Sequence, residues 1–477
     1  MFIFYGTGEK MDNNLEKRYG LFTAVCMVVG IVIGSGVFFK AQDILNQTGG
    51  NMPLGILAWL IGGAVMLICA LTFSTLASQY GKVNGIVDYA EAAVGDRYAY
   101  FVGWFMTTVY YPGMTSVLAW VSARYTLSLF GSDDITGGLC MTLAALYLCL
   151  AYALNALSPR LAGRFQVSST VIKLIPLIVM AAVGTAAGFF NGNMSAAFAS
   201  WSKSSADGGF SGIFAAVVAS AFAYEGWIIA TSINAELKKA KRNMPLALTA
   251  GSLIIISVYI LYYIGLSGAA SVDVLRHDGS TAAFTSIFGR VGGAILNTFI
   301  VISCLGTLNG LMLGCTRGMY SLAVRGHGPE PENLSRVDKG TGMPMSSAVC
   351  ALIFCSVWLF YFYGANLTKP IFGLFSFDSS ELPIITIYAF YIPIFVMYAV
   401  KKGRESVFKN IVMPVLSVIA CLFMIFAAVY AHGVAPYLEA SRNGEFSFPV
   451  LFYMIVFAAI MAAGAVFYNR SESKKAL

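Results

Sequence analysis

Charged side chains are scarce in this sequence. Asp, Glu, Lys and Arg make up 11% of its 477 residues, whereas a soluble domain carries about 25%. Hydrophobic residues make up 58%, and the mean hydropathy of the whole chain is +0.74. One membrane anchor needs only ~20 apolar residues, so a single span cannot account for these values. The shortage of charge therefore predicts a membrane protein with many spans.

Groups suited to catalysis or metal binding are equally scarce. The three histidines, His277, His327 and His432, do not cluster with carboxylates along the chain. The nine cysteines form no Cys-x-x-Cys pair and lie in or at the ends of apolar segments, where small buried hydrophobes are expected. The ATP-binding pattern Gly-x-x-x-x-Gly-Lys-Ser/Thr is also missing. We therefore expect no enzyme activity, no metal site and no cofactor.

Twelve apolar segments are long enough to cross a bilayer, which predicts an all-α membrane protein with 12 transmembrane helices. The charged first twenty residues do not form a secretory signal. The expected spans cover residues 20–46, 54–79, 98–130, 136–157, 167–190, 210–236, 246–270, 291–324, 345–364, 379–400, 410–431 and 448–469.

The distribution of Lys and Arg predicts the orientation. With a cytoplasmic N-terminus, 22 of the 30 basic residues fall in inside segments, five fall outside and three lie within spans. Basic residues concentrate on the cytoplasmic side of membrane proteins. We therefore expect a multi-pass protein of the cell (inner or plasma) membrane with both termini in the cytoplasm. The net charge of +7 is then a topology signal, and no nucleic acid partner is expected.

Two expected spans are interrupted in the same way. The first contains Gly34-Ser35-Gly36, and the sixth contains Ala223-Tyr224-Glu225. Glycine-interrupted spans in matching positions of two halves are typical of inverted-repeat transporters. A separation of five spans gives the second repeat the opposite orientation. We therefore predict a five-plus-five inverted repeat (LeuT-like) with helices 1 and 6 broken at mid-membrane.

This interpretation divides the chain into five parts. They are a cytoplasmic N-terminal tail (1–19), a first inverted repeat of helices 1–5 (20–190), a second of helices 6–10 (210–400), peripheral helices 11–12 (410–469) and a cytoplasmic tail (470–477).

Broken helices expose backbone groups that suit a zwitterion. A helix N-terminus offers amides to a carboxylate, and a helix C-terminus offers carbonyls to an ammonium group. The predicted carboxylate ligands are the amides of Ser35, Gly36 and Val37, and the candidate amine ligands are the carbonyls of Val32, Phe222, Ala223 and Glu225. The alternative is that Gly34 and Gly36 only allow close helix packing.

Three motifs carry a family resemblance: the stretch from Gly30 through Gly34-Ser35-Gly36 to Phe38, the stretch from Ala221 to Trp227, and Asn309-Gly310 with Arg317-Gly-Met-Tyr320. In these the chain resembles the amino acid–polyamine–organocation superfamily, and within it the bacterial relatives of the L-type amino acid transporters. The resemblance implies an amino acid substrate. It also implies that Phe222 is a gating aromatic, that Glu225 faces the substrate and that helices 11 and 12 are peripheral. Trp227 flanks the same break and is a second gate candidate.

The animal members of that family bind a heavy-chain glycoprotein through a cysteine in the loop between spans 3 and 4. The corresponding loop here, residues 131–137, contains no cysteine, and Cys140 is expected within span 4. We therefore expect no heavy-chain glycoprotein partner.

Lys173 lies within the fifth span, where a lysine costs roughly 2.5–3.5 kcal/mol on insertion scales. The resemblance places it where sodium-coupled relatives hold sodium, bridging helices 1 and 8, and in some members this lysine is the proton site. Lys173 is therefore a candidate coupling residue for sodium-independent transport. The alternative is snorkelling to the cytoplasmic surface.

Glu225 is the second ionisable residue of interest inside a span, and four roles are open to it. It could accept the substrate ammonium, favour a cationic side chain, carry a proton, or act as a protonated structural donor. Three other groups are secondary candidates. Arg124 is expected near a gate, Arg317 is expected to pair with an acid on the cytoplasmic side, and Tyr110 and Tyr111 are expected to line a side-chain pocket.

The leading functional hypothesis is a sodium-independent secondary transporter of amino acids, either an exchanger or a proton-coupled permease, working by alternating access. Its expected partners are the amino acid, the lipid bilayer and protons. The alternative hypothesis for the substrate is a polyamine, another organic cation or a cationic amino acid. A non-transporting amino acid sensor is the alternative of a different class.

Overall fold

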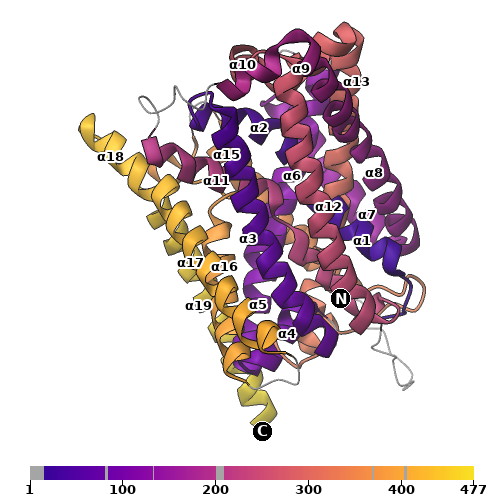
Figure 1. Ribbon diagram of the computed structural model, residues 1–477. Helices are drawn as coiled ribbons and strands as arrows, with labels where there is room; N and C mark the ends of the chain where they lie inside the picture. Colours follow the sequence, from indigo (N-terminus) through magenta and orange to yellow (C-terminus); the bar gives the residue numbers. More distant parts are fainter. Residues whose placement is uncertain are drawn as a thin grey trace.

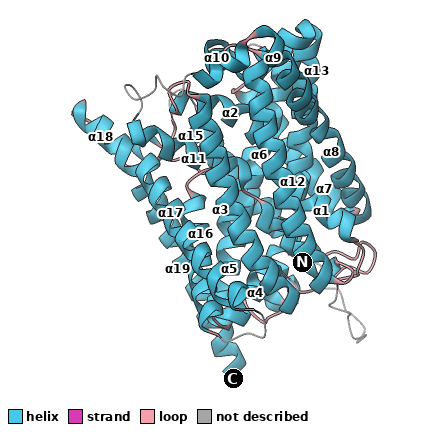
Figure 2. Ribbon diagram, in the orientation of Figure 1, coloured by secondary structure: helices cyan, strands magenta, loops and turns pink. Residues whose placement is uncertain are grey.

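The structure is a computed structural model that describes residues 15–80, 84–132, 134–199, 209–367, 370–401 and 406–476. In these ranges every regular element is a helix, and the only β feature is an isolated parallel bridge between Tyr19 and Leu237 (Figure 2). The helices form one elongated bundle (Figure 1). They are α1 Leu21–Val32, α2 Gly36–Gln47, α3 Met52–Gln79, α4 Gly85–Ala93, α5 Asp96–Phe105, η1 Met106–Tyr110, α6 Tyr111–Leu129, α7 Gly138–Leu157, α8 Pro159–Val179, η2 Met180–Gly184, α9 Thr185–Asn191, α10 Asn193–Ala199, α11 Gly209–Tyr224, η4 Trp227–Glu236, α12 Ala240–Ala269, α13 Val272–Ala323, α14 Pro331–Leu334, α15 Met345–Ala365, η5 Gly373–Phe375, α16 Pro383–Val400, η6 Phe408–Val412, α17 Met413–Val429, η7 Tyr430–Val434, α18 Ala435–Arg442 and α19 Pro449–Ala476.

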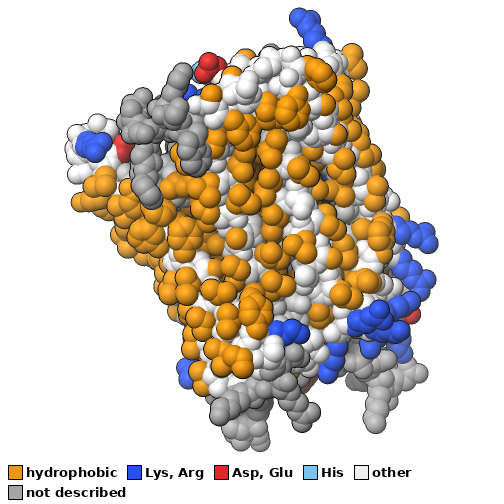
Figure 3. Space-filling view, in the orientation of Figure 1, with side chains coloured by type: hydrophobic (Ala, Val, Ile, Leu, Met, Phe, Trp, Pro, Cys, Tyr) orange, Lys and Arg blue, Asp and Glu red, His pale blue; other side chains and the backbone are white. Residues whose placement is uncertain are grey.

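The chain is a multi-pass membrane protein. Among the described residues, ten helices are long and apolar enough to cross a bilayer, and the pair α1 and α2, bent by 42°, makes an eleventh candidate. Figure 3 shows the wall of hydrophobic side chains that these helices present. The expected all-α class is confirmed, whereas the count of twelve stays a prediction.

The expected span without such a helix is 98–130, which the structure builds from α5, η1 and α6. Most residues of α6 are buried inside the bundle. Its hydroxyl groups bond to its own backbone, as Ser122 Oγ does to the carbonyl of Leu118 at 2.6 Å. A helix that is surrounded by protein can carry such polar residues, so hydropathy alone describes it poorly.

The centre of the bundle brings the two interrupted segments together. α1 packs against α12, α8, α13 and η4, while α2 packs against α11 and α13. In contrast, α17 lies outside against α16 and α3, and α19 is the most exposed of the candidate spans. Figure 1 shows α17, α18 and α19 together along one side of the bundle. The peripheral role expected for residues 410–469 stays a prediction.

Three expected boundaries differ from the structure. α13 begins at Val272 and contains left-handed residues at Gly279 (φ 62°) and Gly289 (φ 70°), so the span expected at 291–324 is only its last part. α19 continues through the segment 470–476 that was expected to be a tail. Residues 1–14 lie outside the described residues, but Leu15 and Tyr19 of the expected N-terminal tail are buried against the bundle.

The bundle has two ends, a terminal end near the chain termini and a vestibule end that contains the larger cavity described below. The terminal end holds the beginning of α1 and the end of α19, and the vestibule end holds α2 and α10 (Figure 1).

Candidate functional site

The break in the first span leaves a helix end on either side. α1 ends at Val32 and α2 begins at Gly36, with Ser35 as its N-cap residue. Because α2 begins there, its first amides have no partner inside the helix. A Cβ atom on Gly36 would lie 3.1 Å from the Cα atom of Ala223. The missing side chain therefore lets the two interrupted segments approach closely.

The break in the sixth span depends on one glycine. α11 ends at Tyr224, Gly226 is left-handed (φ 98°), and the chain continues from Trp227 as the 3-10 helix η4. A side chain at Gly226 would be strained in this conformation and would also meet Ile31 of α1 at 2.9 Å. The change of helix type frees backbone groups beside the end of α1.

A small cavity lies between the two breaks. Its volume is about 20 Å³, and one water molecule already needs ~10–15 Å³. The structure places six of the seven predicted binding residues in its lining, whereas Val37 is fully buried in α2. The six are Val32, Ser35, Gly36, Phe222, Ala223 and Glu225. An amino acid can enter this space only if its walls move apart.

Phe222 separates this cavity from a larger one at the vestibule end. The larger cavity, here called the vestibule, has a volume of about 450 Å³, and its lining includes Phe222, Phe39, Lys40 and Arg124. The Lys40 ammonium lies 5.3 Å from the centroid of the Phe222 ring and 5.2 Å from that of Phe39. Among the described residues, Phe222 alone lines both spaces, and its role as a gate stays a prediction.

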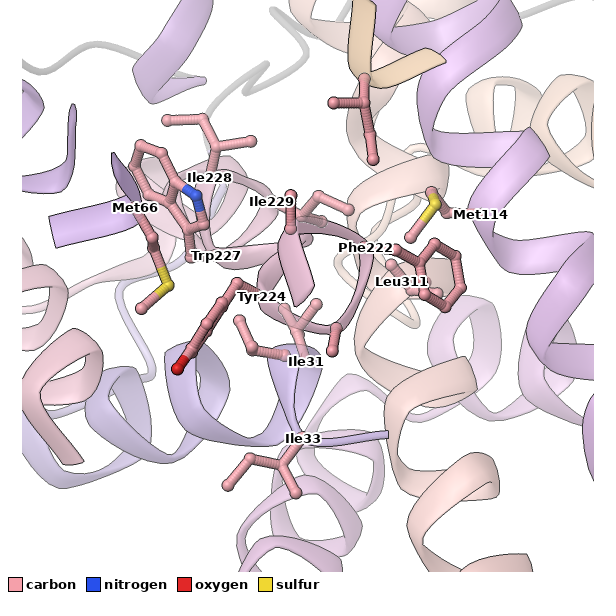
Figure 4. Close-up of a cluster of buried hydrophobic side chains, with 14 of the residues drawn as sticks. Ile31, Ile33, Met66, Met114, Phe222, Tyr224, Trp227, Ile228, Ile229 and Leu311 are labelled. Carbon is pink, nitrogen blue, oxygen red and sulfur yellow. The ribbon is translucent and has the colours of Figure 1, made fainter. Parts of the chain in front are cut away.

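Trp227, the second gate candidate, lies on the other side of the break. Figure 4 shows Phe222 beside Met114 and Leu311, while Trp227 points toward Met66. Trp227 is 1% exposed and lines neither cavity. Its gating role therefore stays a prediction.

Lys173 reaches the carbonyl end of α1. Its Nζ donates hydrogen bonds to the carbonyls of Gly30 (2.8 Å) and Ile33 (2.6 Å) and to Thr307 Oγ1 of α13 (3.1 Å). The side chain is completely buried. The ammonium group is thus surrounded by oxygen atoms at the break of the first span, where a metal cation could also be bound. Its hydrogen bonds connect α8 to α1 and α13. Because the side chain is completely buried, Lys173 does not snorkel to the membrane surface.

Glu225 is enclosed by tyrosines. It is 4% exposed, and Tyr110 from η1 donates a hydrogen bond to its Oε2. Tyr388 of α16 and the Gly226 amide also interact with the carboxylate. Tyr110 and Tyr111 were both expected to line a side-chain pocket, but neither lines the small cavity or the vestibule, and Tyr110 reaches the site only through its contact with Glu225. Glu225 lines the small cavity, and its carboxylate also connects the break of the sixth span to η1 and α16.

Tyr259 of α12 is a site residue that the sequence pattern did not identify. Its hydroxyl lies 3.2 Å from the carbonyl oxygen of Val32 and 3.1 Å from that of Ala223. These are two of the four carbonyls predicted to bind an amine. A single tyrosine surrounded by apolar residues gives no local signal, so only the fold reveals that it connects the two breaks.

An ion-pair group closes the vestibule end. Lys40 Nζ lies 2.5 Å from Glu381 Oε1 and 3.2 Å from Asp43. Glu381 Oε2 lies 2.8 Å from Nε2 of His432 in η7. The group therefore links α2, the start of α16 and the span of α17, directly beside the Phe222 ring.

The terminal end is closed by backbone hydrogen bonds and a buried ion pair. The amides of Arg18 (2.8 Å) and Tyr19 (3.0 Å) donate to the carbonyl of Glu236, and the Lys238 amide donates to the carbonyl of Tyr19 (2.9 Å). The side chain of Glu236 pairs with Arg317 of α13, and both are fully buried. The expectation that Arg317 pairs with an acid is confirmed.

These features define a class: a multi-pass transporter with a central site between two interrupted helices. The fold is that of the crystal structure of MhsT in complex with L-phenylalanine, with a TM-score of 0.60 at 12% sequence identity over 88% of this chain and 99% of that chain. The expected LeuT-like fold is thereby confirmed. The family model described as amino acid permease matches residues 19–467. The chain belongs to the amino acid permease family.

Curated relatives carry the same kind of function. The serine/threonine exchanger SteT of Bacillus subtilis is 28% identical over 86% of this chain and 90% of its own length. The glutamate/serine transporter AimA of the same organism is 25% identical over 87% and 77%. The mouse b(0,+)-type amino acid transporter 1 is 24% identical over 90% and 86%. The chain is thus an amino acid transporter of this family, as its motifs indicate.

Proposed function

We propose that this protein carries α-amino acids across the cell membrane by alternating access without sodium, as an exchanger or a proton-coupled permease. The observation that carries the proposal is the position of Lys173. Its ammonium group donates to the carbonyls of Gly30 and Ile33 and to Thr307, which are the oxygen ligands that a sodium ion would need. A positive charge at this place repels a second cation.

The backbone of the substrate is proposed to bind across the two breaks. The amides of Ser35, Gly36 and Val37 at the start of α2 suit the carboxylate. The carbonyls of Val32, Phe222, Ala223 and Glu225 are the candidates for the ammonium group. Because Tyr259 already donates to two of these carbonyls, an arriving amine would displace its hydroxyl or share them with it.

Small polar amino acids are the proposed substrates to test first. Serine appears in the names of both SteT and AimA, and the cavity is small even before a substrate enters. Glu225 supports a cationic amino acid or a polyamine as the alternative, because its carboxylate lines this cavity. Its contact with Tyr110 favours the first reading, since the carboxylate already has a donor.

The terminal end is proposed to face the cytoplasm. Most Lys and Arg residues belong to segments at this end, in agreement with the positive-inside rule. The vestibule then opens outward, and the structure corresponds to a state closed toward the cytoplasm. Reorientation requires the contacts of Tyr19, Glu236 and Arg317 to separate.

Uptake by the purified chain in proteoliposomes tests the proposal. Labelled serine, threonine, alanine, glutamate, arginine and putrescine would be offered with and without internal serine, under imposed sodium or proton gradients. We expect serine uptake that does not respond to sodium and that rises with internal serine or with a proton gradient. Uptake that requires sodium contradicts the role of Lys173. Binding without uptake would indicate a sensor, and activity only with an added glycoprotein would contradict the expected absence of a heavy chain.

A further inference from the structure

A basic groove lies at the terminal end between the beginnings of α1 and α8. Its volume is about 700 Å³, and Lys238 closes it on the third side. Tyr19 forms part of its lining, with the hydroxyl donating to the carbonyl of Pro159 at 3.1 Å. A Cβ atom on Gly163 would lie 2.8 Å from the Tyr19 ring, so the glycine allows the ring to pack against α8 at this position. The groove is therefore built into the packing of the helices.

The charge of the groove is strongly one-sided. Glu16 is its single acid, and it is shared between Arg18 (3.3 Å) and Arg160 (4.0 Å). Within the ranges that the structure describes, no ion pair joins the other three cations of the groove to a carboxylate. The five cations are Lys17, Arg18, Arg160, Arg164 and Lys238. This excess of positive charge requires an anionic occupant or solvent counterions.

The same groove opens onto an apolar surface. Phe22 in its lining is 66% exposed, and Leu161, which follows the lining residue Arg160 in α8, is 52% exposed. Farther along α8, Val171 and Ile178 are also exposed. Figure 3 shows Lys and Arg gathered at the lower right of the molecule, below the wall of hydrophobic side chains. An occupant that satisfies both parts has an anionic head and apolar tails.

We propose that this groove binds the phosphate-bearing headgroup of an anionic phospholipid, with the acyl chains lying along the exposed side of α8. The cations attract the phosphate, and the hydroxyls of Thr23 and Ser168 in the lining add hydrogen-bond donors. A soluble anion would use the cations and leave the apolar wall unused. Neither the substrate cavity nor the vestibule shares a residue with this groove.

Binding here also affects the closed state of the terminal end. The amides of the lining residues Arg18 and Tyr19 donate to the Glu236 carbonyl of η4, and the amide of Lys238, which follows η4, donates to the Tyr19 carbonyl. A headgroup held between α8, Arg18 and Lys238 links the segment before α1 both to α8 and to the segment that follows η4. The lipid therefore stabilises the closed terminal end, and its loss favours opening.

The test measures lipid binding to the purified full-length chain. Fluorescently labelled phosphatidylglycerol or phosphatidylcholine would be titrated onto the wild type and onto the triple variant Lys17→Gln, Arg164→Gln, Lys238→Gln. Each basic residue near a membrane surface contributes about a factor of five, so the triple variant should bind phosphatidylglycerol on the order of a hundredfold more weakly. Binding should also weaken with salt, because exposed charges are screened.

A matched control separates a site from general surface charge. The triple variant Lys241→Gln, Arg242→Gln, Lys474→Gln removes the same charge from exposed positions at the same end but outside the groove. It should keep wild-type affinity, and an equal loss in both triple variants overturns the proposal. Displacement of the lipid by inorganic phosphate at matched ionic strength would point to a soluble anion and would overturn it as well.

Hydrogen exchange gives a readout that does not depend on transport. In nanodiscs that mix phosphatidylcholine and phosphatidylglycerol in equal parts, the amides of residues 15–23 should exchange more slowly than in pure phosphatidylcholine. The groove variant should show no difference between the two membranes. Equal exchange of the wild type in both membranes contradicts the stabilising effect.

Discussion

The two ends of the bundle are closed by different kinds of contact. At the terminal end, main-chain hydrogen bonds join Tyr19 to Glu236 and Lys238, and the Arg317 ion pair is fully buried beneath them. At the vestibule end, one ring, that of Phe222, and one group of ion pairs around Lys40 stand between the small cavity and a space of about 450 Å³. The terminal closure is thick and the vestibule closure is thin.

This difference indicates which half of the transport cycle has the larger free-energy cost. Opening the vestibule end needs a rotation of Phe222 and the loss of side-chain contacts that water can replace. Opening the terminal end separates backbone pairs and uncovers two buried charges, which costs more unless the bound substrate or another contact compensates. The state described here is therefore the one in which a substrate arriving through the vestibule meets the smaller barrier.

The largest expected effect comes from the terminal end. Arg317→Ala leaves the Glu236 carboxylate buried without its cation, and loss of one partner of a buried pair costs about 3–5 kcal/mol. We expect a marked drop in the stability of the purified protein, measured by thermal unfolding in detergent. The double variant Arg317→Met, Glu236→Leu removes both charges and should regain most of that stability. Wild-type stability in Arg317→Ala would remove the contrast between the ends.

Lys173 lies between the ends and should give the next effect. Lys173→Ala leaves the carbonyls of Gly30 and Ile33 without their buried donor, at about 1–3 kcal/mol for an unsatisfied group. Uptake in proteoliposomes should fall about tenfold, since 1.4 kcal/mol corresponds to that factor. Lys241→Ala on the exposed side of α12 serves as the control and should transport normally. An unchanged rate and pH profile in Lys173→Ala would falsify the coupling role.

Tyr259→Phe removes only the hydroxyl that connects the two breaks. The expected loss is about 0.5–1.5 kcal/mol, the net contribution of one hydrogen bond. It should appear as lower stability of the substrate-free protein in thermal unfolding, while substrate binding in a competition assay should not weaken, because the amine no longer competes with a hydroxyl for the two carbonyls. Tyr263→Phe, one turn further along α12, is the matched control, because its buried hydroxyl has no hydrogen-bond partner among the described residues. Equal effects of both substitutions would argue against a site role for Tyr259.

The smallest effect is expected at the vestibule end. Lys40→Met removes one cation from a group in which Glu381 still has His432 at 2.8 Å. The side chains of Lys40 (14% exposed) and Glu381 (8% exposed) are largely buried, but Glu381 keeps His432 as a partner, so we expect a smaller loss of stability than for Arg317→Ala. Thermal unfolding measured beside Arg317→Ala compares the two ends directly. A larger loss for Lys40→Met than for Arg317→Ala would reverse the comparison.

The sequence contained enough to predict the centre of the molecule. Gly34-Ser35-Gly36 and Gly226 interrupt helices through backbone preferences, which are local and can be recognised in one chain. Lys173 stood out because a lysine in an apolar segment is costly. Most of the predicted binding residues therefore line the cavity in the structure.

Contacts between segments far apart in the chain could not be predicted from the sequence. Arg317 was expected to pair with some acid, but Glu236 lies 81 positions away and nothing local identifies it. Tyr259 is one of 25 tyrosines, and only the packing of α12 against α1 gives it a role. The segment before α1 was expected to be a tail because it precedes the first expected span, although its main chain pairs with the bundle.

The parallel bridge between Tyr19 and Leu237 has a consequence for variation in the sequence. Its hydrogen bonds use amides and carbonyls, which every residue except proline supplies. A substitution scan should therefore find that proline at Arg18 or Lys238 impairs transport more than any other residue does. The chain can change its surface at this point over generations while the closure that the cycle depends on is preserved.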